Sequence, residues 1–199
     1  MPAPRIYYIR HGETEWNALG RLQGTRDVPL NAKGAKQACA AGAILANLLP
    51  RDGRDVSSVG FVSSPLGRAR TTMELVRGTL RLPQDGYAID DRLREIGYGA
   101  WEGSTLEEAE AHDPDLYARR LADKWTVAAP GGESYAEVQA RVSAWYAGLT
   151  ADTVAVAHGG TARTLMVALG FETAQSAADL YIEQGVVYVF RTGRLAKFS

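Results

Sequence analysis

Short apolar runs alternate with helical patterns along the chain. Such runs occupy residues 5–9, 59–63 and 153–157, and each is followed by a polar or glycine-containing turn and a helical pattern. Short continuous apolar strands between helices are typical of a parallel sheet covered on both faces. A late run at 186–190 predicts a further strand, which pairs with 194–198 as a hairpin. The sequence therefore predicts a three-layer α/β sandwich with a mostly parallel central sheet flanked by helices.

Helices are indicated where apolar side chains recur every three or four residues. This spacing predicts helices over 66–80 and 135–149, the first with Pro65 in its opening turn. Asn31 predicts the start of an alanine-rich helix that runs to about Leu49. These helices supply the two outer layers.

Residues 104–133 have a different character and predict a small helical lid. Ser104 with Glu107 has the spacing of a capped helix start. Pro114 and Pro130 interrupt the segment, so we expect one or two short helices there.

Composition limits the class of protein. The 199 residues are 46% hydrophobic, which predicts a single domain over 1–199 with an ordinary core and the lid inserted at about 104–133. With 22 basic and 23 acidic residues the net charge is −1, which disfavours nucleic acid as a partner. The single cysteine, Cys39, excludes an internal disulfide and is expected to be a small buried residue. No apolar run has membrane-spanning length, so we expect a cytoplasmic protein without a membrane partner.

Arginine or histidine follows each of the three predicted strands. Arg10 and His11 follow the first, Arg68 the second and His158 the third. Ligands of open parallel sheets bind beyond the carboxyl ends of the strands. Two guanidinium groups grip phosphate oxygens in pairs, and the first helical turn that holds Arg68 also favours an anion. The two arginines are expected to lower the pKa of His11, so that a neutral ring is free to attack phosphorus. His158 adds a further donor, cationic when phosphate is bound.

Longer segments carry a family resemblance. Arg10-His-Gly-Glu-Thr-Glu-Trp-Asn17, Gly20-Arg-Leu-Gln-Gly24 and Asp27-Val-Pro-Leu-Asn-Ala-Lys-Gly34 follow one another. Together they resemble the opening signature of the phosphoglycerate mutase-like histidine phosphatase superfamily, RHGxTxxN with a glycine loop and a D-x-P-L segment. Four later segments resemble further blocks of that family, in its order: 63–72, 93–103, 130–134 and 156–160.

The resemblance implies a site and a role for each member. His11 is the nucleophile that forms a phosphohistidine, and Glu95 is the general acid and base. The residues implied to be catalytic are Arg10, His11, Arg68, Glu95 and His158. The residues implied to bind substrate are Asn17, Gln23, Gly24 and Gly159. Glu102 is expected to be structural, and neither a metal nor a cofactor is expected.

The function predicted first is hydrolysis of a small phosphorylated metabolite. The alternatives are a cofactor-dependent phosphoglycerate mutase and a non-catalytic phosphate-binding module. Mutases of the family resemble one another in having a lysine at the position that Leu106 occupies in this chain. Arg119 and Arg120 are interpreted either as a solvated helix face or as contacts for a distal anionic group. The intact set of predicted catalytic residues favours an enzyme over a binding module.

Overall fold

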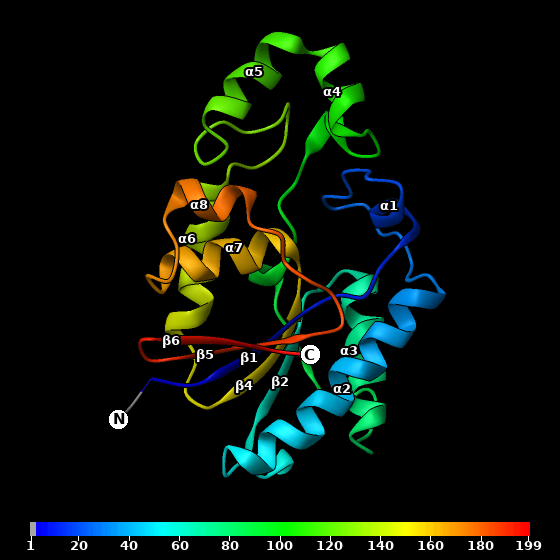
Figure 1. Ribbon diagram of the computed structural model, residues 1–199, viewed down its shortest axis with the longest axis vertical. Coiled ribbons are helices and arrows are strands. Elements are labelled where there is room, and N and C mark those ends of the chain that lie inside the picture. Colours follow the sequence, from blue (N-terminus) through cyan, green and yellow to red (C-terminus); the bar gives the residue numbers. More distant parts are fainter. Residues whose placement is uncertain (1–2) are drawn as a thin grey trace.

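A six-stranded sheet lies at the centre of the computed structural model, which describes residues 3–199 (Figure 1). The strands are β1 (Ile6–Arg10), β2 (Gly60–Ser63), β3 (Ala88–Ile89), β4 (Thr153–Ala157), β5 (Val187–Arg191) and β6 (Arg194–Phe198). Their order is β3-β2-β4-β1-β5-β6. The first four run parallel, whereas β5 is antiparallel to both β1 and β6. The predicted mostly parallel sheet and its terminal hairpin are confirmed.

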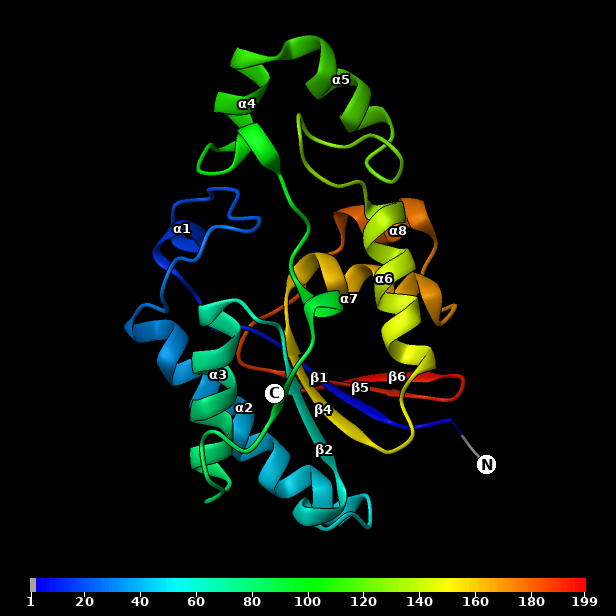
Figure 2. The same cartoon turned by 180° about the vertical axis from the view of Figure 1, so that it is seen from behind.

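Helices cover both faces of the sheet (Figure 2). The helices are α1 (Glu15–Ala18), α2 (Ala32–Arg51), α3 (Gly67–Thr79), α4 (Leu106–His112), α5 (Pro114–Ala122), α6 (Tyr135–Ala147), α7 (Gly159–Ala168) and α8 (Ala174–Asp179). Single turns of 3-10 helix are η1 (Val56–Ser58), η2 (Asp91–Leu93) and η3 (Gly99–Trp101). Helices α2 and α3 cover one face, and α6 and α7 cover the other.

Side chains of β1 alternate between the two helical layers. Tyr7 and Ile9 belong to the core beneath α2 and α3, whereas Ile6 and Tyr8 belong to the core beneath α6 and α7. Successive strand residues point to opposite faces, so a strand buried on both sides has to be apolar throughout. The Tyr8 hydroxyl still finds a partner, because it donates to the carbonyl oxygen of His158 at 2.7 Å.

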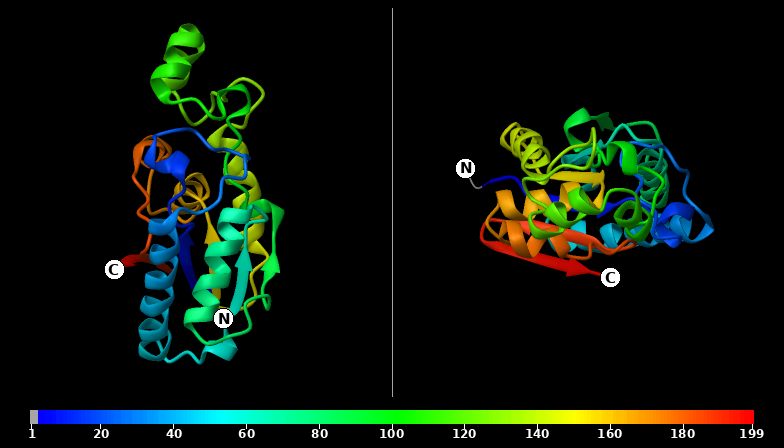
Figure 3. Two further views of the ribbon diagram at one scale, coloured as in Figure 1. Left: turned by 90° about the vertical axis from the view of Figure 1, so that its right-hand side faces the viewer. Right: turned by 90° about the horizontal axis from the view of Figure 1, so that it is seen from above.

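The predicted lid is formed by α4 and α5, which stand beyond the carboxyl ends of the parallel strands (Figure 3). Its start is corrected by one residue. Thr105 rather than Ser104 caps α4, and the reciprocal bonds join Thr105 to Glu108. Trp101 packs with lid side chains in a small cluster of its own. Among the described residues, no helix combines the length and the apolar character needed to cross a membrane.

Two further local predictions are wrong. Pro65 lies before α3 rather than in its first turn, because the helix begins at Gly67 with Leu66 as its cap. Cys39 is exposed. The buried stripe of α2 includes Ala38 on one side of Cys39, and the cysteine itself falls on the solvent face. An alanine-rich helix shows its apolar stripe poorly, because alanine is found on both faces.

Candidate active site

The carboxyl ends of three parallel strands bring two histidines and a serine together. β1, β2 and β4 pair in register and end at the same edge of the sheet, where His11, Ser64 and His158 follow them. The ring centroids of His11 and His158 lie 5.1 Å apart. His158 Nε2 lies 2.7 Å from Ser64 Oγ.

A pocket of about 170 Å³ opens at this edge, and we call it the phosphate pocket after the ligand that the sequence predicts for its residues. All predicted site residues line it except His158, which packs against His11 instead. The predicted residues in its wall are Arg10, His11, Asn17, Gln23, Gly24, Arg68, Glu95 and Gly159. A larger cavity of about 510 Å³ lies between the C-terminal ends of α2 and α3 and contains none of them.

His11 is held as a neutral ring with one defined tautomer. Its Nδ1 lies 2.7 Å from the carbonyl oxygen of Gly12. A carbonyl only accepts, so Nδ1 carries the proton and Nε2 keeps a lone pair. Burial, then the charges of Arg68 and Arg10, lower the pKa of His11 well below its ordinary value. The predicted direction is therefore confirmed, although desolvation rather than the arginines is the largest cause.

The Arg68 guanidinium is fixed by the loop that precedes α2. Only 1% of Arg68 is exposed, and its Nη1 and Nη2 donate to the carbonyl oxygens of Arg26 and Gly24 at 2.6 and 2.8 Å. Gly24 has a φ of 53°, and a Cβ there would meet Glu102 Oε1 at 2.0 Å. A glycine is therefore required for the loop to reach Arg68.

The first turn of α3 is occupied by a carboxylate of the protein itself. The backbone N–H groups of Gly67 and Arg68 donate to the two carboxylate oxygens of Asp27 at 2.9 and 3.4 Å. The expectation that this helix start offers its own N–H groups to phosphate is therefore wrong. What α3 presents to the pocket is the Arg68 side chain.

Arg10 is half-buried and is held from the opposite side. Its Nη1 donates to the carbonyl oxygen of Ile182 at 2.7 Å, and its guanidinium carbon lies 5.9 Å from the centre of the Tyr181 ring. Burial lowers the pKa of Arg10, while the Glu95 carboxylate opposes that shift. The segment between α8 and β5 thus fixes the position of Arg10.

The Glu95 carboxylate lies against the start of α7. Its Oε1 accepts from the backbone N–H of Gly160 at 3.0 Å and from that of Ile96 at 2.9 Å. A Cβ at Gly160 would approach Glu95 Oε1 to 2.3 Å, so glycine allows the close contact. The N-terminus of a helix favours a carboxylate at this position.

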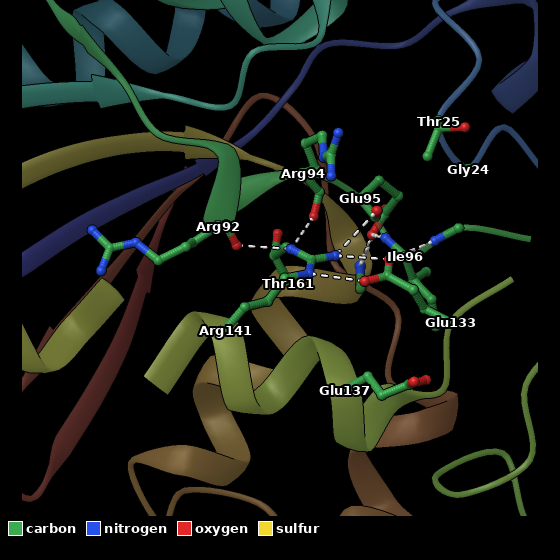
Figure 4. A network of polar contacts seen from close by, with 12 residues as sticks. Gly24, Thr25, Arg92, Arg94, Glu95, Ile96, Glu133, Glu137, Arg141 and Thr161 are labelled. Carbon is green, nitrogen blue, oxygen red and sulfur yellow. Dashed lines mark hydrogen bonds and ion pairs between the residues drawn. The ribbon is translucent and has the colours of Figure 1, made fainter. Parts of the chain in front are cut away.

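The backbone around Glu95 is fixed by an ion pair outside the pocket (Figure 4). Arg141 and Glu133 pair at 3.0 Å, and Figure 4 shows both lying alongside the 92–96 segment. Arg141 donates to backbone carbonyls of this segment, whereas Glu133 Oε2 accepts from the N–H of Gly97 at 2.9 Å. Both partners therefore hold the segment that presents Glu95.

His158 is fully buried and also neutral. Burial, followed by the charge of Arg68, lowers the pKa of His158 well below its ordinary value. A bound phosphate dianion acts in the opposite direction, because it favours the charged ring. The expectation that His158 is cationic when phosphate is bound therefore stays a prediction.

Asn17 and Gln23 supply uncharged polar groups. Asn17 Oδ1 accepts from the backbone N–H of Thr14 and from Nε2 of Gln184, both at 3.2 Å. The Asn17 side chain therefore has its amide N–H groups, and not its oxygen, to offer to a ligand. Gln23 is 6% exposed. Glu102 has the structural role expected of it, since it accepts from the backbone N–H of Thr25 at 2.8 Å.

Sequence reasoning missed Arg163, Arg21, Leu22 and Tyr98, which also line the phosphate pocket. Arg163 donates from Nε to the carbonyl oxygen of Leu180 at 2.8 Å. It lies one helical turn after Gly159, on the same face of α7, and that spacing is the signal by which it could have been found.

Arg119 and Arg120, which are adjacent in the lid, have different environments in the structure. Arg119 is exposed, as expected of a solvated helix face. Arg120 is only 7% exposed, and its guanidinium carbon lies 5.6 Å from the centre of the Tyr98 ring. Only the second arginine therefore faces the interior.

Most of the buried polar atoms that have no partner belong to residues of this site. Among the described residues such atoms are Arg10 Nε, Gln23 Oε1, Arg68 Nε, Trp101 Nε1 and His158 Nδ1. Leaving a buried donor unpaired costs about 1–3 kcal/mol. The two guanidinium nitrogens therefore indicate a site that binds an anion with acceptor oxygens.

Known proteins are similar to this chain in sequence and in fold. The pattern of the Histidine phosphatase superfamily (branch 1) matches residues 6–194. A bifunctional protein of Mycobacterium tuberculosis is 40% identical over 138 residues, which are 69% of this chain and 35% of that protein. The chain thus spans about a third of the length of that relative.

Two further relatives match over nearly the whole chain. The 2,3-bisphosphoglycerate-dependent phosphoglycerate mutase of Methylobacterium radiotolerans is 33% identical over 193 residues, covering 94% of this chain and 88% of the mutase. The structure of a mycobacterial glucosyl-3-phosphoglycerate phosphatase in complex with VO3 is 31% identical with a TM-score of 0.76, covering 94% of this chain and 92% of the phosphatase. The chain belongs to the histidine phosphatase superfamily.

Proposed function

We propose that the chain is a phosphatase that hydrolyses small phosphate monoesters through a phosphohistidine on His11. The observation that carries this proposal is the neutral, buried His11 ring, whose Nε2 keeps its lone pair beside Arg10 and Arg68. A phosphate monoester is a dianion near pH 7, and its transfer needs positive charge around the equatorial oxygens. The two arginines supply that charge.

In the first step, His11 Nε2 attacks phosphorus, and the N–P bond forms as the ester P–O bond breaks. The reactive form is the one in which Glu95 carries a proton, although the α7 N-terminus favours its carboxylate. Glu95 transfers this proton to the departing oxygen, so that the alcohol leaves uncharged. The phosphorylated ring is cationic, and the hydrogen bond from Nδ1 to the Gly12 carbonyl stabilises that charge.

In the second step, water attacks the phosphohistidine. Glu95, now a carboxylate, accepts a proton from the water as the new O–P bond forms. The N–P bond breaks, its electron pair returns to His11 Nε2, and inorganic phosphate leaves. Glu95 ends the cycle protonated, ready for the next ester.

Rapid mixing with a ³²P-labelled ester tests the proposal. We expect labelled protein whose label is lost in acid and retained in base, because a phosphoramidate behaves in this way. His11→Ala should abolish both the label and turnover, whereas His112→Ala, at an exposed position in α4, should change neither. A label that survives acid and is lost in base would identify a carboxylate nucleophile and overturn the proposal.

Mutase activity is the second candidate, and the similarity to the Methylobacterium enzyme supports it. A mutase returns the phosphoryl group from His11 to a second hydroxyl instead of to water. It therefore has to grip a bisphosphorylated intermediate at both ends. Whether the residues around the phosphate pocket can bind a second phosphate group therefore decides between hydrolysis and the mutase reaction.

A further inference from the structure

A second pocket of about 110 Å³ adjoins the phosphate pocket. The two share Leu22 and Tyr98 in their walls. We call the second one the lid pocket, because most of its wall comes from η3, α4 and α5. Its remaining lining residues are Trp101, Leu106, Tyr117, Arg120, Leu121 and Lys124. The lid pocket is therefore the neighbouring space for a group attached to a phosphate bound at His11.

The wall of the lid pocket is mainly aromatic and apolar. The rings of Trp101 and Tyr117 lie 6.2 Å apart between centroids. Leu106 and Leu121 also line the pocket although they are 51% and 59% exposed. Large apolar side chains left exposed around a concave surface mark a binding site for an apolar group.

The two cations in this wall already have protein acceptors. Arg120 Nη1 donates to the carbonyl oxygen of Val127, and its guanidinium lies over the Tyr98 ring. Lys124 pairs with the Asp179 carboxylate. With its cations engaged in this way, the lid pocket is poorly suited to a second phosphate.

One donor in the wall has no acceptor. Trp101 is 3% exposed, and its indole Nε1 has no hydrogen-bond partner among the described residues. A buried tryptophan N–H usually finds a partner. An acceptor atom on a bound ring would satisfy it.

We infer that the lid pocket is the subsite for the alcohol part of the substrate and takes one aromatic ring that carries a hydrogen-bond acceptor. Its volume of about 110 Å³ limits it to a single ring, since an apolar cavity that binds benzene has about 150 Å³. The inference rests on the proposed function, in which the phosphate group is anchored at His11. It narrows the substrate class to phosphate monoesters of alcohols that bear an aromatic ring.

Phosphonates test the subsite without turnover, because their C–P bond is not hydrolysed. Calorimetry should give a Kd for 3-phenylpropylphosphonate at least tenfold lower than that for propylphosphonate, since ring burial removes apolar surface from water. Among the pyridyl analogues, one isomer should bind more tightly than the phenyl compound. That gain should disappear in Trp101→Phe, which keeps an aromatic ring but removes the N–H.

Leu106 and Leu121 are exposed, so both can be substituted without disturbing the hydrophobic core. The double variant Leu106→Gln/Leu121→Gln should reduce the preference for the phenyl compound at least threefold without changing the Kd of propylphosphonate. Ile89→Gln is the matched control, because Ile89 is 52% exposed and lies outside the pocket.

Release of phosphate from 2-phenylethyl phosphate, measured in parallel, separates the two proposals. Equal Kd values for the phenyl and propyl phosphonates would overturn the subsite, whether or not the ester is hydrolysed. A strong phenyl preference without phosphate release would support the subsite and overturn the proposed hydrolysis.

Discussion

Arg141 Nη2 donates a hydrogen bond to the carbonyl oxygen of Glu95 at 3.2 Å. Arg141 belongs to α6 and does not line the phosphate pocket. The same guanidinium also donates from Nη1 to the carbonyl oxygens of Arg92 and Arg94 at 2.7 and 2.6 Å. A planar fork satisfies several acceptors at once, which the compact ammonium group of lysine does not. Arg141 therefore positions the backbone from which Glu95 reaches the pocket.

We expect Arg141→Lys to lower kcat for alkyl phosphates by about tenfold, because a misplaced general acid protonates the leaving oxygen less efficiently. KM and inhibition by inorganic phosphate should change little, since Arg10 and Arg68 are untouched. The loss should be smaller for p-nitrophenyl phosphate, whose leaving group departs without a proton. Steady-state kinetics on both esters measure this difference.

The control for this variant is Arg119→Lys, at an exposed position in α5, which should behave like the parent protein. Thermal unfolding of both variants shows whether the fold is retained. Equal losses on the two esters would contradict a positioning role for Arg141 and indicate a general structural defect.

The sequence predicted which side chains lie together where they follow directly from strand ends. His11 and His158 each come immediately after a strand, and parallel register then makes them neighbours. Contacts that depend on packing between distant segments were not visible. Asp27 reaches the start of α3 across 40 residues of sequence, and Arg163 meets the pocket only because α7 packs against β1. Local patterns carry no information on such contacts.

We expect phosphate release to be unchanged after dialysis against EDTA. In the proposed mechanism, Arg10 and Arg68 supply the positive charge that a divalent ion supplies in other phosphoryl-transfer sites. Initial rates before and after dialysis, with and without added Mg²⁺, measure this. Activity that is lost and then restored by the divalent ion would contradict the arginine-based pocket.

We expect the free energy of unfolding to fall between pH 7.5 and 5.5. Burial keeps the pKa of His11 and of His158 below the value near 6.5 of the unfolded chain. Below pH 6.5 the unfolded state therefore binds more protons, so this stability is complete above pH 6.5 and is lost as the pH falls. Each ring contributes a slope that approaches about 1.4 kcal/mol per pH unit well below pH 6.5.

Urea unfolding of two variants assigns that slope. His158→Gln should reduce the loss between pH 7.5 and 5.5 by about 1 kcal/mol. His112→Gln should leave it unchanged, because His112 is exposed at the end of α4. Identical pH profiles for the parent protein and His158→Gln would contradict the depressed pKa of His158.

Phosphate release should dominate over isomerisation. Mutases of the family resemble one another in having a lysine at the position that Leu106 occupies in this chain. Arg120 of the lid already donates a hydrogen bond to the Val127 carbonyl oxygen. The loss of one charged contact to a distal phosphate costs about 1.5–3 kcal/mol, a factor of roughly ten to one hundred in affinity. We therefore expect inorganic phosphate from simple monoesters and little interconversion of 3- and 2-phosphoglycerate, even with 2,3-bisphosphoglycerate supplied.

The side chain at position 106 tests the physical reason for this expectation. Leu106→Lys places an ammonium group in the lid pocket and should tighten inhibition by 2,3-bisphosphoglycerate about tenfold at low salt. Ile89→Lys adds the same charge outside both pockets and should leave the inhibition constant unchanged. If the parent protein isomerises phosphoglycerate faster than it releases phosphate, the mutase reaction replaces hydrolysis as its function. In that case groups other than a cationic side chain at position 106 have to bind the distal phosphate.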